Sequence, residues 1–252
     1  MSVYEYLNKT AKAKGACFLV LLDPDKLDQK RIRQTGKLIA ESGADGILFG
    51  TSLMMSGRID EQVKALKQAS KLPVIIFPGS AYQVSKHADA ILFMSLISGR
   101  NANLLIEEQV KAAPMVARSG LEAIATGYML IESGKLTSAN YISNTIPMPR
   151  DKPDIAVAHA LAAKLLGMRL VYMDAGSGAQ QPVSEQMIAA VAQHSRLPVV
   201  VGGGIKTPED AALRAKAGAT AIVIGNVLEG DINLAKRFAQ AIHFKTTESR
   251  KH

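Results

Sequence analysis

The chain is poor in cysteine and in aromatic residues. Among its 252 residues it has one cysteine, no tryptophan and an aromatic content of 5%. A single cysteine cannot form an internal disulfide or a cysteine-based metal site. Because Cys17 lies in the apolar run CFLVLL, we expect it to be a buried core thiol, as free cysteines often are. This cysteine usage fits the reducing cytoplasm, which is the location we expect.

Long apolar runs are also missing. No run reaches the roughly 18 residues that a membrane-spanning helix needs. Residues 1–15 contain no apolar segment of the kind found in signal peptides, so we expect no signal peptide. The hydrophobic content of 48% and charged content of 21% are typical of a globular protein.

The charge balance favours an anionic partner. The formal net charge is +8, which suits a phosphorylated small molecule, a nucleic acid or an anionic membrane surface. The basic residues are scattered, apart from the short tail with Lys245, Arg250 and Lys251. We find no nucleic-acid-binding motif, so we expect a phosphorylated small molecule and no nucleic acid.

Short apolar runs alternate with longer amphipathic stretches. Such runs, hydrophobic almost throughout, are typical of parallel strands that are covered on both faces. We expect strands over 18–22, 46–49, 74–77, 90–94, 123–126, 170–173, 199–201 and 221–224. We expect helices over 29–42, 59–70, 155–166, 184–194, 208–217 and 232–242.

This alternation predicts an α/β fold, a single (β/α)8 TIM barrel that forms one domain over residues 1–252. Gly43, Gly167 and Gly218 each follow a predicted helix, the position where glycine ends helices. The connection over 132–152 is unusually long, and long connections in compact folds are often functional.

Three glycine-containing segments follow the last three predicted strands. They are Asp174-Ala175-Gly176-Ser177-Gly178-Ala179, Gly202-Gly203-Gly204-Ile205-Lys206 and Gly225-Asn226. Glycines let the main chain approach an anion, so that several N–H groups converge on phosphate oxygens. The helices that follow would also direct their N-termini at this point. The sequence therefore predicts a phosphate-binding site in the C-terminal half of the barrel.

Polar residues also follow the first two strands. Asp23 ends the first strand, and the hydroxyls of Thr51 and Ser52 follow the second. A carboxylate, a hydroxyl and several waters suit Mg2+. Asp25 is expected to cap the next helix. The histidines lack metal-ligand spacing, so we expect structural or surface roles for His87, His159 and His194, with His243 and His252 in the tail.

Together these motifs resemble the geranylgeranylglyceryl phosphate synthase family, which includes the bacterial heptaprenylglyceryl phosphate synthases. The likeness covers about residues 18–231. The motifs that carry it are LDPDK at 22–26, GTS at 50–52, Ser143 with PMPRDKPD at 147–154, YMDAGSG at 172–178, GGGI at 202–205 and GN at 225–226. Glycine loops occur in many barrels, whereas their combination with the other segments is specific.

The resemblance implies transfer of a geranylgeranyl or similar polyprenyl group from its diphosphate to the 3-hydroxyl of sn-glycerol 1-phosphate, with release of diphosphate. It implies that Asp23 and Ser52 bind Mg2+. The residues implied to hold glycerol 1-phosphate are Tyr172, Met173, Asp174, Ala175, Gly176, Ser177, Gly178, Gly203, Gly204, Gly225 and Asn226. The family's barrels also imply a homo-oligomer, a dimer or a hexamer.

Asp174 is the expected proton acceptor, and Tyr172 is the second catalytic candidate. The ring of Tyr128 or Tyr172 would face the positive charge that develops on the prenyl group. The family commonly has Glu where this chain has Asp174. The shorter-chain bacterial group has Lys where this chain has Leu21, so the chain resembles the other group, which includes many archaeal enzymes.

The groove for the prenyl chain has no clear sequence signal. Met54, Met55, Phe93, Leu96 and Ile97 are candidates, and ordinary core packing explains them equally well. No aspartate-rich cluster of the chain-elongating prenyl synthases is present. Because prenyl diphosphates partition into membranes, the basic surface suits loose contact with anionic lipid.

Other functions on the same barrel remain open. A phosphosugar isomerase, epimerase or lyase would use the same glycine loops, and so would a barrel that binds a flavin phosphate. A non-catalytic phosphate sensor would bind glycerol phosphate without turning it over.

Overall fold

The computed structural model describes residues 1–27, 30–55 and 57–245. Eight parallel strands form a closed barrel in chain order. The strands are β1 (Cys17–Leu22), β2 (Gly46–Phe49), β3 (Val74–Ile76), β4 (Ala90–Leu96), β5 (Glu122–Leu130), β6 (Leu170–Asp174), β7 (Val199–Gly202) and β8 (Ala221–Ile224). Pairing of Cys17 with Ala221 closes β1 onto β8. This confirms the predicted (β/α)8 barrel.

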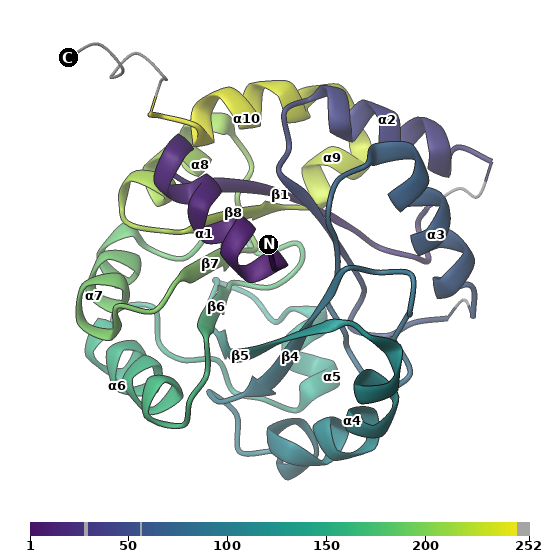
Figure 1. The fold of residues 1–252 in the computed structure, drawn as a ribbon. Helices are drawn as coiled ribbons and strands as arrows, with labels where there is room; N and C mark the ends of the chain where they lie inside the picture. Colours follow the sequence, from purple (N-terminus) through teal and green to yellow (C-terminus); the bar gives the residue numbers. More distant parts are fainter. Residues whose placement is uncertain (28–29, 56, 246–252) are drawn as a thin grey trace.

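Most of the helices surround the barrel, whereas α1 (Val3–Lys14) lies across one of its ends (Figure 1). The others are α2 (Ile32–Glu41), α3 (Ile59–Ser70), α4 (Glu108–Ser119), α5 (Ser138–Ser143), α6 (Pro153–Leu165), α7 (Glu185–Ser195), α8 (Pro208–Lys216), α9 (Asn226–Gly230) and α10 (Ala235–Ile242). A π-helical turn, η1 (Asn103–Glu107), precedes α4, and a 3-10 turn, η2 (Ile232–Leu234), precedes α10. The connection over 77–89 carries no helix.

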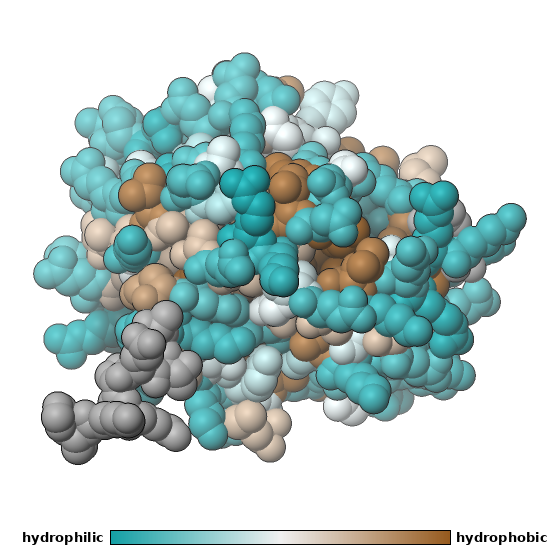
Figure 2. All heavy atoms as spheres, turned by 90° about the horizontal axis from the view of Figure 1, so that it is seen from above, coloured by the Kyte–Doolittle hydropathy of each residue, from teal (hydrophilic) through white to brown (hydrophobic). Residues whose placement is uncertain are grey.

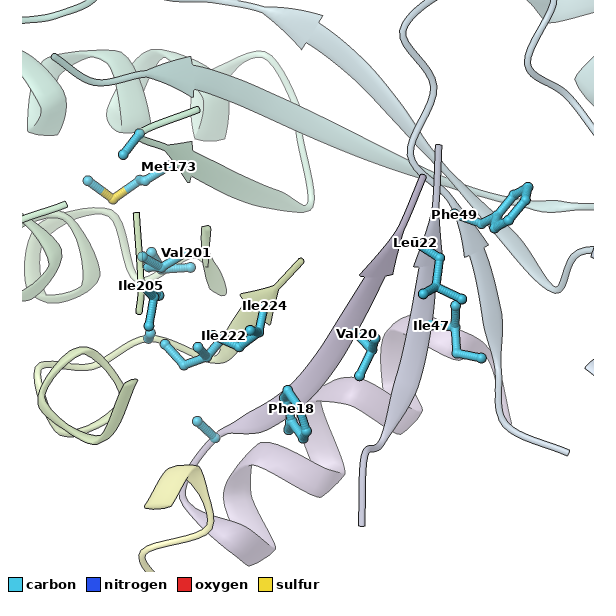
Figure 3. Packing of buried hydrophobic residues seen from close by; sticks show 14 of the residues in the cluster. Phe18, Val20, Leu22, Ile47, Phe49, Met173, Val201, Ile205, Ile222 and Ile224 are labelled. Carbon is cyan, nitrogen blue, oxygen red and sulfur yellow. The ribbon is translucent and has the colours of Figure 1, made fainter. Parts of the chain in front are cut away.

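Side chains alternate between two apolar layers, because successive residues of a strand point to opposite faces. In β1, Leu19 packs inside the barrel, whereas Phe18 and Val20 pack between the strands and the helices. Figure 3 shows this outer layer, with Phe18 on β1, Ile47 on β2 and further labelled side chains on β6 to β8. Burial on both faces explains why the strands are almost continuously hydrophobic.

Several helix ends match the sequence signals. Ser184 accepts a hydrogen bond from the Met187 N–H group and caps α7. Thr207 caps α8, with Pro208 as its first residue. The glycines that follow α2, α6 and α8 have positive φ, as expected for left-handed residues that end helices.

Asp25 does not have its predicted role as the cap of the next helix. Helix α2 begins at Ile32, and Arg31 occupies its N-cap position. Asp25 instead accepts a hydrogen bond from the Met55 N–H group at 2.8 Å. The predicted helix start at 29 lies outside the described residues, as do Arg250, Lys251 and His252.

Helix α1 lies across the N-terminal end of the barrel (Figure 1). The buried Asp45, 1% exposed, accepts hydrogen bonds from Lys14 Nζ at 2.5 Å, Phe18 N–H at 2.8 Å and His243 Nε2 at 2.8 Å. His243 therefore belongs to a buried cluster that joins α1, β1 and the end of α10, and not to a free tail. Cys17 is buried, as predicted.

The surface of the α2 and α10 side is mostly hydrophilic, with small groups of hydrophobic side chains between the polar ones (Figure 2). Within the described part of the chain, no helix combines the length and apolar character required to cross a membrane.

Candidate functional site

A cavity of about 760 Å3 opens at the C-terminal end of the barrel. One end is polar and includes Gly178, Gly204 and Asn226 from the loops after β6, β7 and β8. The other end reaches Phe93 on β4 and Ala112 on α4, and its lining combines apolar with polar side chains. The connection over 77–89, which carries no helix, also lines the cavity, through residues such as Phe77, Gly79 and Val84.

The three predicted glycine loops come together at the polar end. Ser177 Oγ donates a hydrogen bond to Asn226 Oδ1 at 2.9 Å, which joins the β6 and β8 loops. Gly203 has φ of 80° and packs so closely on the β6 loop that an added Cβ would lie 2.5 Å from Gly176 N. We call residues 176–178, 203–204 and 225–226 the phosphate loops.

One helix N-terminus lies at this end. Of the helices after these loops, α9 begins within the loops at Asn226, whereas α7 and α8 begin further along the chain, at Glu185 and Pro208. The predicted contribution of helix N-termini is therefore restricted to the short α9. Lys206 adds a positive charge to the cavity lining, and its Nζ donates to Gln180 O at 3.1 Å.

Asp174 ends β6, lines the cavity and is 7% exposed. Its Oδ1 accepts a hydrogen bond from Gly176 N–H at 2.7 Å, and its Oδ2 accepts one from Tyr128 Oη at 2.5 Å. Burial raises the pKa of Asp174 above its ordinary value, although both hydrogen bonds lower it. A carboxylate with a raised pKa suits a proton acceptor that works near neutral pH.

Three aromatic rings meet beside Asp174. The rings of Phe77 and Tyr172 are stacked with centroids 4.9 Å apart. The Tyr128 ring packs edge-on against both, at 5.8 Å from Phe77 and 5.4 Å from Tyr172. Burial, and then the charge of Asp174, raise the pKa of Tyr128 and Tyr172 well above the ordinary value. Both hydroxyls therefore remain protonated near neutral pH.

The predicted metal ligands lie on the β1 and β2 side of the cavity. Asp23, Thr51 and Ser52 all line it. Asp23 Oδ2 accepts a hydrogen bond from Thr51 Oγ1 at 3.2 Å, and Asp23 Oδ1 accepts one from the Asp25 N–H group at 3.0 Å. A carboxylate has further lone pairs, so Asp23 retains acceptor capacity toward the cavity.

This donor set is sparse. Among the described residues, no three or more His, Cys, Asp or Glu side chains gather as a metal cluster. One carboxylate and neighbouring hydroxyls nevertheless fit Mg2+, which usually keeps several waters and binds through one or two carboxylates plus substrate phosphates. Lys26, in the loop after β1, also lines the cavity, and it pairs with Glu229 of α9 at 2.8 Å.

Most of the predicted site residues line one cavity. Those that line it are Asp23, Ser52, Tyr172, Asp174, Ser177, Gly178, Gly203, Gly204, Gly225 and Asn226. Gly176 contributes through its N–H group to Asp174. Met173 and Ala175 instead bury their side chains in the outer apolar layer, where Figure 3 labels Met173.

The predicted groove residues divide in the same way. Phe93 and Leu96 line the cavity. Met54 and Ile97 pack against the outer core, and Met55 is 81% exposed. Sequence reasoning did not select the polar side chains that line the cavity near α4, which are Asn101, Asn103, Glu108 and Gln109. The sequence shows no regular helical pattern around these residues, because the π-helical turn over Asn103–Glu107 directly precedes α4.

The long connection over 132–152 covers the β6 loop. Gln181 N–H donates to Ser133 O at 3.2 Å, and an added Cβ on Gly176 would lie 2.4 Å from Thr137 Oγ1. Helix α5 then lines the cavity through Ser138 and Ile142. The connection therefore supports the phosphate loops and forms part of the cavity wall.

Comparisons with known proteins agree with this geometry. The PcrB family matches residues 8–243. A geranylgeranylglyceryl phosphate synthase from Chitinophaga pinensis is 48% identical over 233 residues, covering 92% of each chain. One from Korarchaeum cryptofilum is 44% identical over 218 residues, covering 86% of this chain and 89% of the relative.

A solved structure is also similar. It is the (S)-3-O-geranylgeranylglyceryl phosphate synthase from Thermoplasma acidophilum in complex with its substrate sn-glycerol-1-phosphate. The TM-score is 0.91 at 34% identity, and the match covers 96% of this chain and 99% of that one.

Proposed function

The chain belongs to the PcrB family, and from that premise we propose that it transfers a prenyl group to glycerol phosphate. The donor is geranylgeranyl diphosphate or a similar polyprenyl diphosphate, and the acceptor is the 3-hydroxyl of sn-glycerol 1-phosphate. The observation that carries the proposal is one cavity that joins phosphate loops to an arm with apolar side chains of β4 and α4, with the Asp174 carboxylate in its lining.

The polar end suits the glycerol phosphate. Glycine main chain at 203–204 and the Ser177 and Asn226 side chains can surround phosphate oxygens, and Lys206 adds positive charge. The bound sn-glycerol-1-phosphate in the Thermoplasma acidophilum structure supports this assignment. We assign Met173, Ala175 and Gly176 to the same site through their main chain.

The other end suits the prenyl chain. Phe93, Leu96 and Leu104 line it together with Ala112 of α4. Each Å2 of apolar prenyl surface that is buried there contributes roughly 25 cal/mol to the free energy of binding. A phosphosugar isomerase or epimerase would share the phosphate loops but has no use for this arm, which is why we favour prenyl transfer.

Magnesium belongs to the proposal as well. Asp23 and Ser52 would hold Mg2+, with Thr51 orienting the Asp23 carboxylate through its hydrogen bond. When bound, the ion neutralises the charge that develops on the departing diphosphate. One carboxylate at this position leaves coordination sites for water and phosphate oxygens.

The protein's own residues then contribute mainly by positioning the two substrates. The phosphate loops fix the glycerol hydroxyl near the prenyl carbon, which converts a bimolecular encounter into a local one. The ring cluster of Phe77, Tyr128 and Tyr172 offers π faces to positive charge on that carbon. Asp174 accepts the hydroxyl proton. We therefore assign catalytic roles to Asp174 and Tyr172.

Assembly and location are proposed on more general grounds. Tyr141 and Ile146 are 74% and 89% exposed near α5, and Leu165 is 87% exposed at the end of α6. Such apolar side chains suit burial between subunits, so we assign a homo-oligomer, a dimer or a hexamer, which light scattering would measure. We also assign one domain, a cytoplasmic location and loose contact with anionic membrane surfaces, favoured by the net charge of +8.

Ligand selectivity tests the proposal against its alternatives. We expect calorimetry to detect binding of sn-glycerol 1-phosphate and weaker binding of sn-glycerol 3-phosphate. Product mass spectrometry with prenyl diphosphates of several lengths should then detect the prenyl ether of glycerol phosphate. A yellow protein with bound flavin, or turnover of a phosphosugar without prenyl transfer, would contradict it.

A further inference from the structure

The Tyr128 hydroxyl connects the Asp174 carboxylate to the cavity. It donates its proton to Asp174 Oδ2 at 2.5 Å. Because a phenol has one proton, the lone pairs of Tyr128 Oη point away from Asp174. Tyr128 lines the cavity and is half-buried, whereas Asp174 is buried. Tyr128 Oη therefore has acceptor capacity for a substrate hydroxyl that enters the cavity.

The Asp174 carboxylate is restrained in this position. Its Oδ1 accepts a hydrogen bond from Gly176 N–H at 2.7 Å. On the same side, an added Cβ on Gly203 would lie 2.6 Å from Oδ1, so the main chain of Gly203 is packed against that oxygen. Turning Oδ1 toward a substrate would break the Gly176 bond. Oδ2 is the oxygen that remains to accept a proton, and Tyr128 already donates to it.

The Tyr128 ring is restrained as well. It packs against Phe77 and Tyr172, with centroid distances of 5.8 Å and 5.4 Å. These contacts involve the ring alone. Phenylalanine at this position would keep them and remove only the hydroxyl.

We propose that Tyr128 is a catalytic residue that relays the proton of the glycerol hydroxyl to Asp174. This inference rests on the proposed prenyl transfer. The glycerol oxygen forms a bond to the prenyl carbon while the bond from that carbon to diphosphate breaks and its electron pair leaves with the diphosphate. The glycerol hydroxyl proton passes to Tyr128 Oη as the phenolic proton passes to Asp174 Oδ2. Tyr128 ends neutral, and Asp174 ends protonated and returns its proton to solvent after the product leaves.

The electrostatics agree with a relay in which no tyrosinate accumulates. Burial and the Asp174 charge raise the pKa of Tyr128 well above its ordinary value, so loss of its proton must be matched by gain of another. Burial also raises the pKa of Asp174, which favours the final protonated carboxyl.

Single-turnover rates of Tyr128→Phe, Asp174→Glu and the double variant test the relay. Tyr128→Phe should slow transfer by about 10²- to 10⁴-fold, while its affinity for sn-glycerol 1-phosphate changes by less than about threefold. The longer carboxylate of Asp174→Glu should reach the substrate directly. In that background the Tyr128→Phe change should slow transfer by less than about tenfold, because coupled residues are not additive.

Each result decides a separate claim. If Tyr128→Phe retains more than half the wild-type rate, or slows transfer equally in both backgrounds, the relay is wrong. An inactive but folded Asp174→Glu chain also contradicts it, because the relay predicts a competent longer acceptor. Absence of transfer by the wild-type chain would instead refute the proposed function itself.

Discussion

Gly203 lies directly against Asp174, so that a Cβ on this glycine would be 2.6 Å from Asp174 Oδ1. A phosphate-loop residue that follows β7 is thereby packed on the carboxylate that ends β6. In the proposed mechanism, substrate binding and proton transfer therefore depend on the same few main-chain atoms. Side chains larger than hydrogen have no room at this point.

Gly203→Ala should therefore weaken glycerol phosphate binding by at least about tenfold and lower transfer further, because either Asp174 or the loop must shift. Gly167→Ala is the matched control, because Gly167 has φ of 81° against 80° for Gly203 but has no atoms within 4 Å of an added Cβ. Both variants carry left-handed strain of about 1–2 kcal/mol. Calorimetric binding that is equal in the two variants would contradict the close-packing argument.

Asp174→Asn should stabilise the protein and abolish transfer. Burial raises the pKa of Asp174, so the folded chain binds this proton more tightly than the unfolded chain. The resulting stability is complete below the unfolded pKa and is lost as pH rises through the folded one. At neutral pH the uncharged variant should therefore have a higher Tm than wild type. Each kcal/mol gained in the free energy of unfolding should raise Tm by about 2–4 °C.

This gain should shrink as the pH is lowered, since wild-type Asp174 then becomes neutral too. Thermal unfolding of wild type and Asp174→Asn, from neutral to acidic pH, measures this difference in stability. A variant that is less stable than wild type at neutral pH would show that the buried charge is well compensated. The wild-type transfer rate should rise with pH through the same titration, as the carboxylate becomes available to accept a proton.

Asp23→Asn should reduce Mg2+-dependent transfer by at least about 10³-fold, because it removes the single carboxylate assigned to the ion. Binding of sn-glycerol 1-phosphate alone should change little, since Asp23 lies on the β1 side of the cavity. Asp154→Asn, an exposed position at the start of α6, is the control. Substantial residual turnover of Asp23→Asn, measured with and without EDTA, would refute the metal assignment.

Asp45→Asn should lower stability without altering the site. Burial alone would raise the pKa of Asp45, but hydrogen bonds from His243, Lys14 and Phe18 hold it below its ordinary value. The stability it provides is present above the unfolded pKa of about 3.9 and is lost as pH falls through the folded one. We expect a loss of about 2 kcal/mol at neutral pH.

Urea unfolding of Asp45→Asn at neutral pH and at about pH 3 measures this effect, and the difference from wild type should shrink at the lower pH. The transfer rate of the folded variant should remain that of wild type, because Asp45 lies at the opposite end of the barrel. A changed rate would mean that the two ends are coupled.

The strands and phosphate loops were predictable because their signals are local. Continuous apolar runs mark strands that are buried on both faces, and glycine after a strand marks close approach of the main chain. The β8 prediction over 221–224 matches the structure. Strand β5 extends to Leu130, beyond the predicted end at 126. The prediction stopped there because Gly127 and Tyr128 interrupt the apolar run in the sequence.

Helices α1 and α4 and the shape of the cavity were not predicted. Helix α1 buries only Leu7 and Ala11, so its amphipathic signal is weak. Helix α4 contains Pro114 and follows a π-helical turn. The contact of Tyr128 with Asp174 joins residues 46 positions apart, and only the pairing of β5 with β6 brings them together.

The most direct test of the account is transfer itself. Purified protein would be incubated with Mg2+, geranylgeranyl diphosphate and labelled sn-glycerol 1-phosphate, then extracted with organic solvent. The account predicts label in the organic phase, lost when EDTA is added. Label that stays wholly in the aqueous phase across several prenyl lengths would contradict it and would leave the phosphate loops to a sugar phosphate or a flavin.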